Sequence, residues 1–117
     1  MKILFILNDA PYGTERCYNA LRLARALVKG DPDTRVLVFL MADGVTAARK
    51  GQKTPEGYYN VERMLRQVLV AKNAVLLCGT CMDARGLSDS ELIEGTHRST
   101  LAELAAWTQW ADKVLVF

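Results

Sequence analysis

The sequence predicts an α/β fold in which a parallel sheet is covered by helices on both faces. Three short apolar runs, KILFIL (2–7), RVLVFLM (35–41) and AVLLC (74–78), have the continuous hydrophobicity of strands that are buried on both sides. Stretches with helical periodicity lie between them, and this alternation of strand and helix is typical of parallel sheets. The length corresponds to a single domain, which we expect to span residues 1–117.

The first half of the chain contains one clear helix and one irregular segment. Apolar residues recur at helical spacing between Cys17 and Val28, with Thr14 as the expected N-cap and Gly30-Asp31-Pro32 as the stop. The segment 43–60 contains three glycines and no long periodicity, which predicts a short helical turn followed by a loop. Long loops in compact domains are often functional.

The second half predicts two further helices and a terminal strand. Apolar residues at helical spacing from residue 61 mark a helix that ends near residues 72–73. A last helix is expected over residues 101–108, capped by Ser99 or Thr100. The run KVLVF (113–117) then completes the sheet as a strand.

Composition and charge argue against several classes of function. The net charge is only +2 and Lys and Arg are spread along the chain, which is not typical of a nucleic-acid-binding protein. The apolar stretch Ile3–Leu7 is too short for a signal-peptide core, and no segment reaches membrane-spanning length. We therefore expect a cytoplasmic protein without a membrane partner, in which thiols stay reduced.

The motif LLCGTCMDARG (76–86) is the main functional candidate. It places Cys78 and Cys81 where the third strand ends, and ligands of parallel sheets gather beyond the carboxyl ends of the strands. The segments NDAPYG (8–13) and ADGV (42–45) follow the first two strands and should lie at the same edge. Chemistry is therefore expected at this edge of the sheet.

The cysteine pair has four interpretations: inert structural thiols, a redox pair, half of a zinc site, or a sulfur-carrying nucleophile. A thioredoxin-like pair is disfavoured, because that fold places a proline after the cysteines, whereas Pro11, Pro32 and Pro55 all precede Cys78. The interpretation of both cysteines as inert structural thiols stays open.

Neither a metal nor a cofactor is expected. A structural zinc site needs four ligands, and Cys78 and Cys81 have only Cys17 and His97 as further soft candidates. Cys17 lies on the apolar stripe of the first helix, and His97 lies in the polar stretch EGTHRST (94–100). No GxGxxG follows the first strand, and GVTAARKGQK lacks the ending of a phosphate-binding loop.

A nucleophilic cysteine must be ionised, which requires a positive or N–H-rich environment. Arg85 is close to Cys78 in sequence, although Asp83 opposes its charge. We expect a loop after the third strand and a short helix from Ser88, so that the thiol faces backbone N–H groups. These electrostatics favour a reactive Cys78 without deciding the matter.

Five segments follow one another in a specific order and spacing: NDAPYG (8–13), FLMADGVTA (39–47), GQKTPEGYYN (51–60), LLCGTCMDARG (76–86) and WADKVLVF (110–117). Taken together, these segments resemble the DsrE/DsrF-like family of sulfur-relay proteins, and in particular its small YchN-like branch. The resemblance implies a three-layer α/β/α sandwich with a mainly parallel sheet of about five strands. The fifth strand would lie near residues 90–97, where SELIEGTH has a poor strand pattern.

In sulfur-relay members of the family, a cysteine after the third strand holds sulfur as a persulfide and passes it from a donor protein to an acceptor protein. That cysteine corresponds to Cys78, which implies a small sulfur carrier or sulfurtransferase component without a cofactor. Relatives form rings or hexamers, so a homo-oligomer, a trimer or hexamer, is expected. The expected catalytic residues are Cys78, Cys81 and Arg85, and the expected substrate-binding residues are Asn8, Tyr12, Asp43, Gly44, Gly79 and Thr80.

Two other functions stay open at this point. The protein would be a non-catalytic binding domain if the cleft between the first two strand ends held a small anion and Cys78 were idle. It would be a thiol redox protein if Cys78 and Cys81 formed a disulfide. Cys81 has no counterpart in the relay members considered, and its spacing from Cys78 raises the hypothesis that it resolves the persulfide.

Overall fold

The computed structural model, which describes residues 1–56 and 59–117, contains a single five-stranded sheet with the order β4-β3-β2-β1-β5. Every pair of neighbouring strands is parallel, so all carboxyl ends lie at one edge of the sheet. The strands are β1 (Lys2–Leu7), β2 (Arg35–Leu40), β3 (Ala74–Cys78), β4 (His97–Ser99) and β5 (Lys113–Val116).

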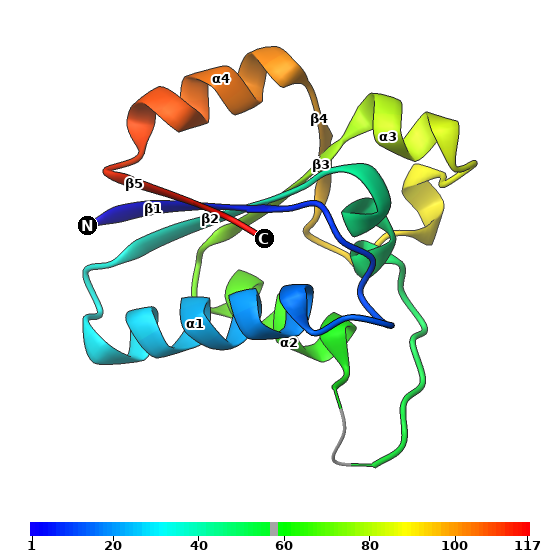
Figure 1. Ribbon diagram of the computed structural model, residues 1–117, viewed down its shortest axis with the longest axis horizontal. Helices are drawn as coiled ribbons and strands as arrows, with labels where there is room; N and C mark the ends of the chain where they lie inside the picture. Colours follow the sequence, from blue (N-terminus) through cyan, green and yellow to red (C-terminus); the bar gives the residue numbers. More distant parts are fainter. Residues whose placement is uncertain (57–58) are drawn as a thin grey trace.

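The helices form the two outer layers of a three-layer sandwich (Figure 1). Helices α1 (Arg16–Gly30) and α2 (Val61–Val70) cover one face of the sheet, and α4 (Leu101–Trp110) covers the other. The predicted α/β architecture is therefore confirmed. The short helices lie at the carboxyl edge of the sheet: η1 (Ala42–Ala48), α3 (Gly79–Ala84) and η2 (Asp89–Glu91).

The central strands are buried on both faces, as their unbroken apolar runs predict. Five of the six residues of β2 are buried, and Phe5 and Phe39 are among the largest fully buried side chains. Burying one such side chain contributes about 1.5–3 kcal/mol, so these strands supply much of the driving force for folding. This buried centre positions the carboxyl edge of the sheet, where the candidate site residues lie.

The predicted starts of the helices are mostly correct. Thr100 caps α4, since its side chain accepts a hydrogen bond from the N–H of Glu103 at 3.2 Å. Thr14 is not the N-cap of α1; Glu15 precedes that helix, and the Thr14 hydroxyl donates to Asp9 Oδ2 at 3.1 Å instead. The Asp9 carboxylate therefore draws the hydroxyl away from the orphan N–H groups of the helix.

The fifth strand lies further along the chain than expected. It is β4, His97–Ser99, and overlaps the expected range 90–97 at one residue only. Its three residues pair with the end of β3, in the register Leu76↔His97 to Cys78↔Ser99. A three-residue strand at the edge of a sheet buries little, so its sequence HRS carries no alternating or apolar pattern.

Candidate functional site

The carboxyl edge of the sheet brings the strand-end segments together. Gly44 in η1 packs against the end of β1, and its N–H lies 3.2 Å from the carbonyl oxygen of Asn8 and 2.8 Å from that of Met41. A Cβ at position 44 would lie 2.2 Å from the carbonyl oxygen of Leu7, so only glycine fits this approach. The sequence ADG thus closes η1 tightly onto the edge of the sheet.

Cys78 is both the last residue of β3 and the N-cap of α3. Its Sγ accepts a hydrogen bond from the N–H of Cys81 at 3.2 Å and lies 3.2 Å from Thr80 Oγ1. The expected loop up to Ser88 is wrong, because α3 begins at Gly79. The expected short helix from Ser88 is present as η2, which begins with a capping box between Ser88 and Glu91.

The three thiols lie in different electrostatic environments. Burial raises the pKa of Cys78, but the Cys81 thiol, the Thr80 hydroxyl and the backbone N–H groups of both residues outweigh it, and the net pKa is lowered. Burial and the Cys78 side chain together raise the pKa of Cys81. Burial and the charge of Asp9 raise the pKa of Cys17 to about 11. Cys78 is therefore the thiol that ionises first.

A cavity of about 660 Å³ lies beside the cysteine pair, and Leu101 and Glu103 of α4 help to line it. Cys78 is 9% exposed, so its sulfur is shielded and still borders this space. The walls are mostly apolar. The cavity is lined by Phe39, Met41, Cys78, Gly79, Thr80, Cys81, Asp83, Arg98, Ser99, Thr100, Leu101 and Glu103.

Arg85, the expected source of positive charge near Cys78, instead contacts Asp43 and the main chain of Cys81. Its Nε donates to Asp43 Oδ1 at 2.9 Å, and its Nη1 donates to the carbonyl oxygen of Cys81 at 3.1 Å. The guanidinium therefore holds α3 against η1 and contacts the main chain of Cys81. Asp43 is connected to α3 by its ion pair with Arg85.

Arg98 in β4 is a site residue that sequence reasoning missed. Its Nη1 donates to the carbonyl oxygen of Gly79 at 3.1 Å, and its guanidinium pairs with Asp83 at 3.0 Å and Asp89 at 3.2 Å. A Cβ on Gly79 would lie 3.0 Å from the Arg98 side chain, so glycine allows this close contact. The pairing of β4 with β3 brings Arg98 here, and no local sequence signal encodes that pairing.

Two expected substrate-binding residues serve other contacts. The Tyr12 hydroxyl donates to Gln52 and accepts from the N–H of Val61 at 3.2 Å, which ties the loop after β1 to the start of α2. Asn8 Nδ2 lies 3.5 Å from the carbonyl oxygen of Phe117. Of the six expected residues, Gly79 and Thr80 line the cavity with Cys78.

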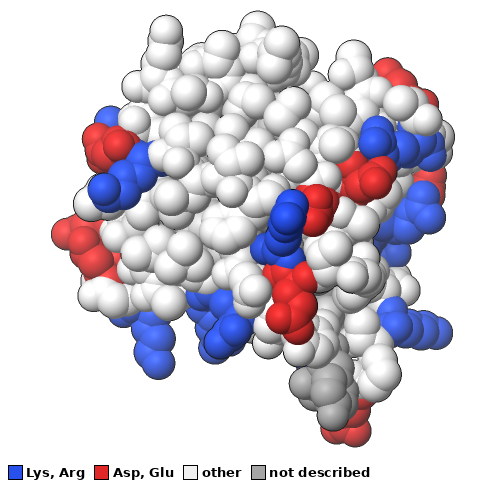
Figure 2. Space-filling model, viewed as in Figure 1, with Lys and Arg blue, Asp and Glu red and all other residues white. Residues whose placement is uncertain are grey.

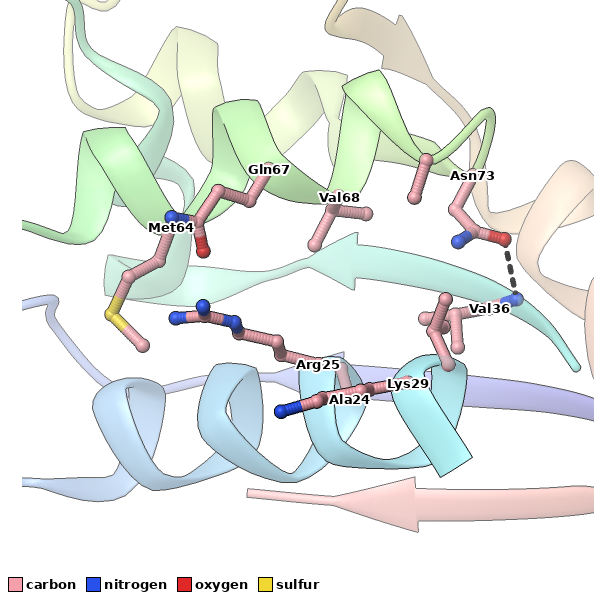
Figure 3. Close-up of a pocket in the computed structure, with 10 residues that line it drawn as sticks. Ala24, Arg25, Lys29, Val36, Met64, Gln67, Val68 and Asn73 are labelled. Atoms are coloured by element: carbon pink, nitrogen blue, oxygen red, sulfur yellow. Dashed lines mark hydrogen bonds between the residues drawn. The ribbon is translucent and has the colours of Figure 1, made fainter. Parts of the chain in front are cut away.

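A second cavity lies on the opposite face of the sheet, between α1 and α2 (Figure 3). It has a volume of about 360 Å³ and an apolar floor that includes Ala24, Val36 and Val68. Arg25 and Gln67 border it from the two helices. Its lining contains no cysteine, whereas Cys78 and Cys81 both line the first cavity.

Within residues 1–56 and 59–117, no group of three or more His, Cys, Asp or Glu side chains is arranged to hold a metal ion. In the same part of the chain, none of the helices has the length and apolar character needed to cross a bilayer.

The fold and the site define a class of protein. The chain belongs to the DsrE/DsrF-like family, whose model matches residues 1–117. It is 50% identical over 117 residues to the protein YchN of Escherichia coli (strain K12), covering 99% of this chain and 98% of that protein. It is 40% identical over 116 residues to a protein of Methanopyrus kandleri, covering 98% of this chain and 93% of that protein.

Solved structures show the same architecture. The crystal structure of the ychN protein from E. coli matches with a TM-score of 0.94 at 48% identity, covering 100% of this chain and 99% of that chain. A protein of unknown function from Methanobacterium thermoautotrophicum matches with a TM-score of 0.79 at 15% identity, covering 97% of each chain. The second match shows a shared fold alone.

Proposed function

We propose that the protein is a small cytoplasmic sulfur carrier that holds sulfur as a persulfide on Cys78 and passes it to a partner protein. The observation that carries this proposal is the Cys78 sulfur, which is hydrogen-bonded at the first turn of α3 and borders a cavity. Membership of the DsrE/DsrF-like family supports it.

The chemistry needs a thiolate in the receiving step. The Cys78 thiolate attacks the terminal sulfur of a donor persulfide, a new S–S bond forms, and the donor leaves as a thiolate. An acceptor thiolate then attacks the terminal sulfur on Cys78 in the same way, and Cys78 leaves as a thiolate. The lowered pKa of Cys78 favours both steps, because Cys78 is the nucleophile in the first and the leaving group in the second.

Hydrogen-bond donors, more than a free cation, stabilise the charge at this site. Arg98 lines the cavity, but two carboxylates already engage its guanidinium. The N–H of Cys81 and the hydroxyl of Thr80 are the groups in direct contact with the Cys78 sulfur. Hydrogen bonds to a charged group are stronger than those between neutral groups, so these donors favour an anionic sulfur on Cys78.

The experiment that tests the proposal is persulfide loading followed by mass analysis. The reduced protein is incubated without oxygen with a low-molecular-weight persulfide, and its intact and peptide masses are measured under non-reducing conditions. We expect one added sulfur atom in the peptide that contains Cys78. The addition should disappear in Cys78→Ser and persist in Cys17→Ser, since Cys17 is fully buried with a raised pKa.

The same experiment separates the two rival functions. A protein that loses two hydrogen atoms across Cys78 and Cys81 with no sulfur ever added would be a thiol redox protein. A protein whose mass does not change would be a binding domain with an idle cysteine. Either result would overturn the carrier proposal.

We also propose that the protein works as a homo-oligomer, a trimer or a hexamer. Exposed apolar side chains on α4 and β5 support this, because soluble monomers rarely leave such surface uncovered. Leu104 is the one buried residue of α4, whereas Leu101 is 72% exposed, and on β5 Val116 is 64% exposed. The surface over α4 is largely free of charge (Figure 2).

A further inference from the structure

Cys81 is a second thiol at the same cavity that carrying sulfur does not require. Its N–H is hydrogen-bonded to the Cys78 sulfur at 3.2 Å, and both residues line the cavity. The two residues are three positions apart across the first turn of α3, which brings side chains to the same side of a helix. The spacing is thus compatible with a short-range disulfide after a small shift of the first turn of α3.

We propose that Cys81 is a resolving cysteine, which releases the sulfur held on Cys78 as sulfide and leaves a Cys78–Cys81 disulfide. This inference rests on the proposed function, since it needs a persulfide on Cys78. It adds a second activity to the site: the sulfur is relayed when an acceptor is present and reduced to sulfide when none arrives.

The reaction balances within one chain. The Cys81 sulfur attacks Sγ of Cys78, a bond forms between these two sulfur atoms, and the bond from Sγ to the terminal sulfur breaks. The Cys81 proton goes to the terminal sulfur, which leaves as hydrosulfide. The terminal sulfur is reduced by two electrons and the cysteine pair is oxidised by two. One turnover needs no other reactant, and a dithiol reductant is needed only to restore the pair.

The protonation of Cys81 suits this role. Burial and the Cys78 side chain raise the pKa of Cys81, so the thiol keeps the proton that the departing sulfur needs. A protonated thiol is also a weak nucleophile, which slows resolution and leaves time for relay to an acceptor. Two groups lower the pKa of Cys81 against these effects: a backbone hydrogen bond at Ala42 in η1, and the charge of Arg85, which is paired with Asp43.

The geometry leaves Cys17 out of this chemistry. Cys17 lies in α1, where its Sγ is 3.0 Å from the carbonyl oxygen of Asp9, and the residue is fully buried. Cys17→Ser is therefore a matched control that removes one thiol without touching the pair.

The test follows the fate of one loaded sulfur. Wild type, Cys81→Ser, Cys81→Ala and Cys17→Ser are loaded with a low-molecular-weight persulfide, desalted without oxygen, and incubated without acceptor. Sulfide is trapped with monobromobimane, and peptide masses are measured over time. We expect wild type and Cys17→Ser to release about one sulfide per loaded chain and to form the Cys78–Cys81 disulfide. The two Cys81 variants should keep the added sulfur on Cys78 and release at least about tenfold less sulfide.

The outcomes separate the inference from the function beneath it. If wild type keeps its sulfur as long as Cys81→Ser does, the resolving role is wrong and the carrier stands. If Cys81→Ser and Cys81→Ala release sulfide as fast as wild type, Cys81 is not the resolving group. If the sulfur is transferred from Cys78 to Cys81 and held there as a persulfide, Cys81 carries sulfur instead of releasing it, and the inference is overturned. If no variant that retains Cys78 gains sulfur there, the carrier function itself fails.

Discussion

At the scale of single residues, the reactivity of Cys78 depends on two short-range donors. Its sulfur contacts the N–H of Cys81 and the hydroxyl of Thr80, both at 3.2 Å. Together with the Cys81 thiol, these contacts outweigh the effect of burial, so the pKa of Cys78 is lowered. The last residue of β3 is therefore a thiol with a lowered pKa.

Replacing Thr80 tests this balance. Thr80→Val keeps the shape of the side chain and removes the hydroxyl, so the pKa of Cys78 should rise. Because thiolate is present above the pKa, the rate of Cys78 alkylation should reach its half-maximum at a higher pH than in wild type. Alkylation rates measured by peptide mass across a pH series check this.

Two further variants serve as controls for that measurement. Thr80→Ser retains a hydroxyl and should restore the wild-type pH profile. Thr108→Val removes a hydroxyl that bonds within α4, at the carbonyl oxygen of Leu104, and should change nothing. An unchanged profile in Thr80→Val would mean that the hydroxyl does not stabilise the thiolate.

Some site residues were predictable from the sequence and others were not. Cys78, Gly79 and Thr80 follow directly from the end of a recognisable strand, because a buried apolar run ends there. Arg98 reaches the same cavity only through the pairing of β4 with β3, a non-local contact that no short stretch encodes. Arg85 is close to Cys78 in sequence, but its guanidinium is hydrogen-bonded to Asp43 and to the Cys81 carbonyl oxygen.

At the scale of elements, the close packing of η1 against β1 holds the strand ends together. We expect Gly44→Ala to destabilise the protein by about 1–3 kcal/mol or more, since its new Cβ would meet the Leu7 carbonyl oxygen at 2.2 Å. Denaturant unfolding at equilibrium measures this loss.

Gly30→Ala is the matched control for that prediction. Gly30 ends α1, and a Cβ there meets nothing within 4 Å. This substitution should be neutral or stabilising by up to about 1 kcal/mol, because alanine lowers the entropy of the unfolded chain. Equal stability changes in the two variants would contradict the packing of η1 described here.

The predictability of the elements follows their burial. The bounds of β1 and β3 agree with the apolar runs 2–7 and 74–78, since a strand that is buried on both faces has no polar residue inside it. β4 was misplaced because an edge strand of three residues needs no such run. The start of α3 was missed because its N-cap is a cysteine, a residue outside the usual capping set.

At the scale of the whole molecule, the uncovered apolar surface of α4 and β5 predicts self-association. Val116→Glu places a charge at a position that is 64% exposed in the single chain, and burying that charge in an interface is costly. We expect at least about tenfold weaker association, seen by light scattering as a lower mass at micromolar concentration.

Val70→Glu is the matched control on the other face of the sheet. Val70 ends α2 and is 83% exposed, so the same change there should leave the mass as in wild type. A wild-type protein that is monomeric at micromolar concentration would contradict the proposed assembly, as would an unchanged mass in Val116→Glu.

Competitive alkylation of the native, reduced protein at neutral pH tests the central claim most directly. A substoichiometric thiol reagent is added, and peptide masses report how much of each of the three cysteines has reacted. We predict that Cys78 reacts first, that Cys81 follows more slowly, and that Cys17 stays unmodified while the protein is folded. If Cys78 reacted no faster than Cys17, the carboxyl edge of β3 would hold no accessible thiolate, and both the carrier and the resolving cysteine would be contradicted.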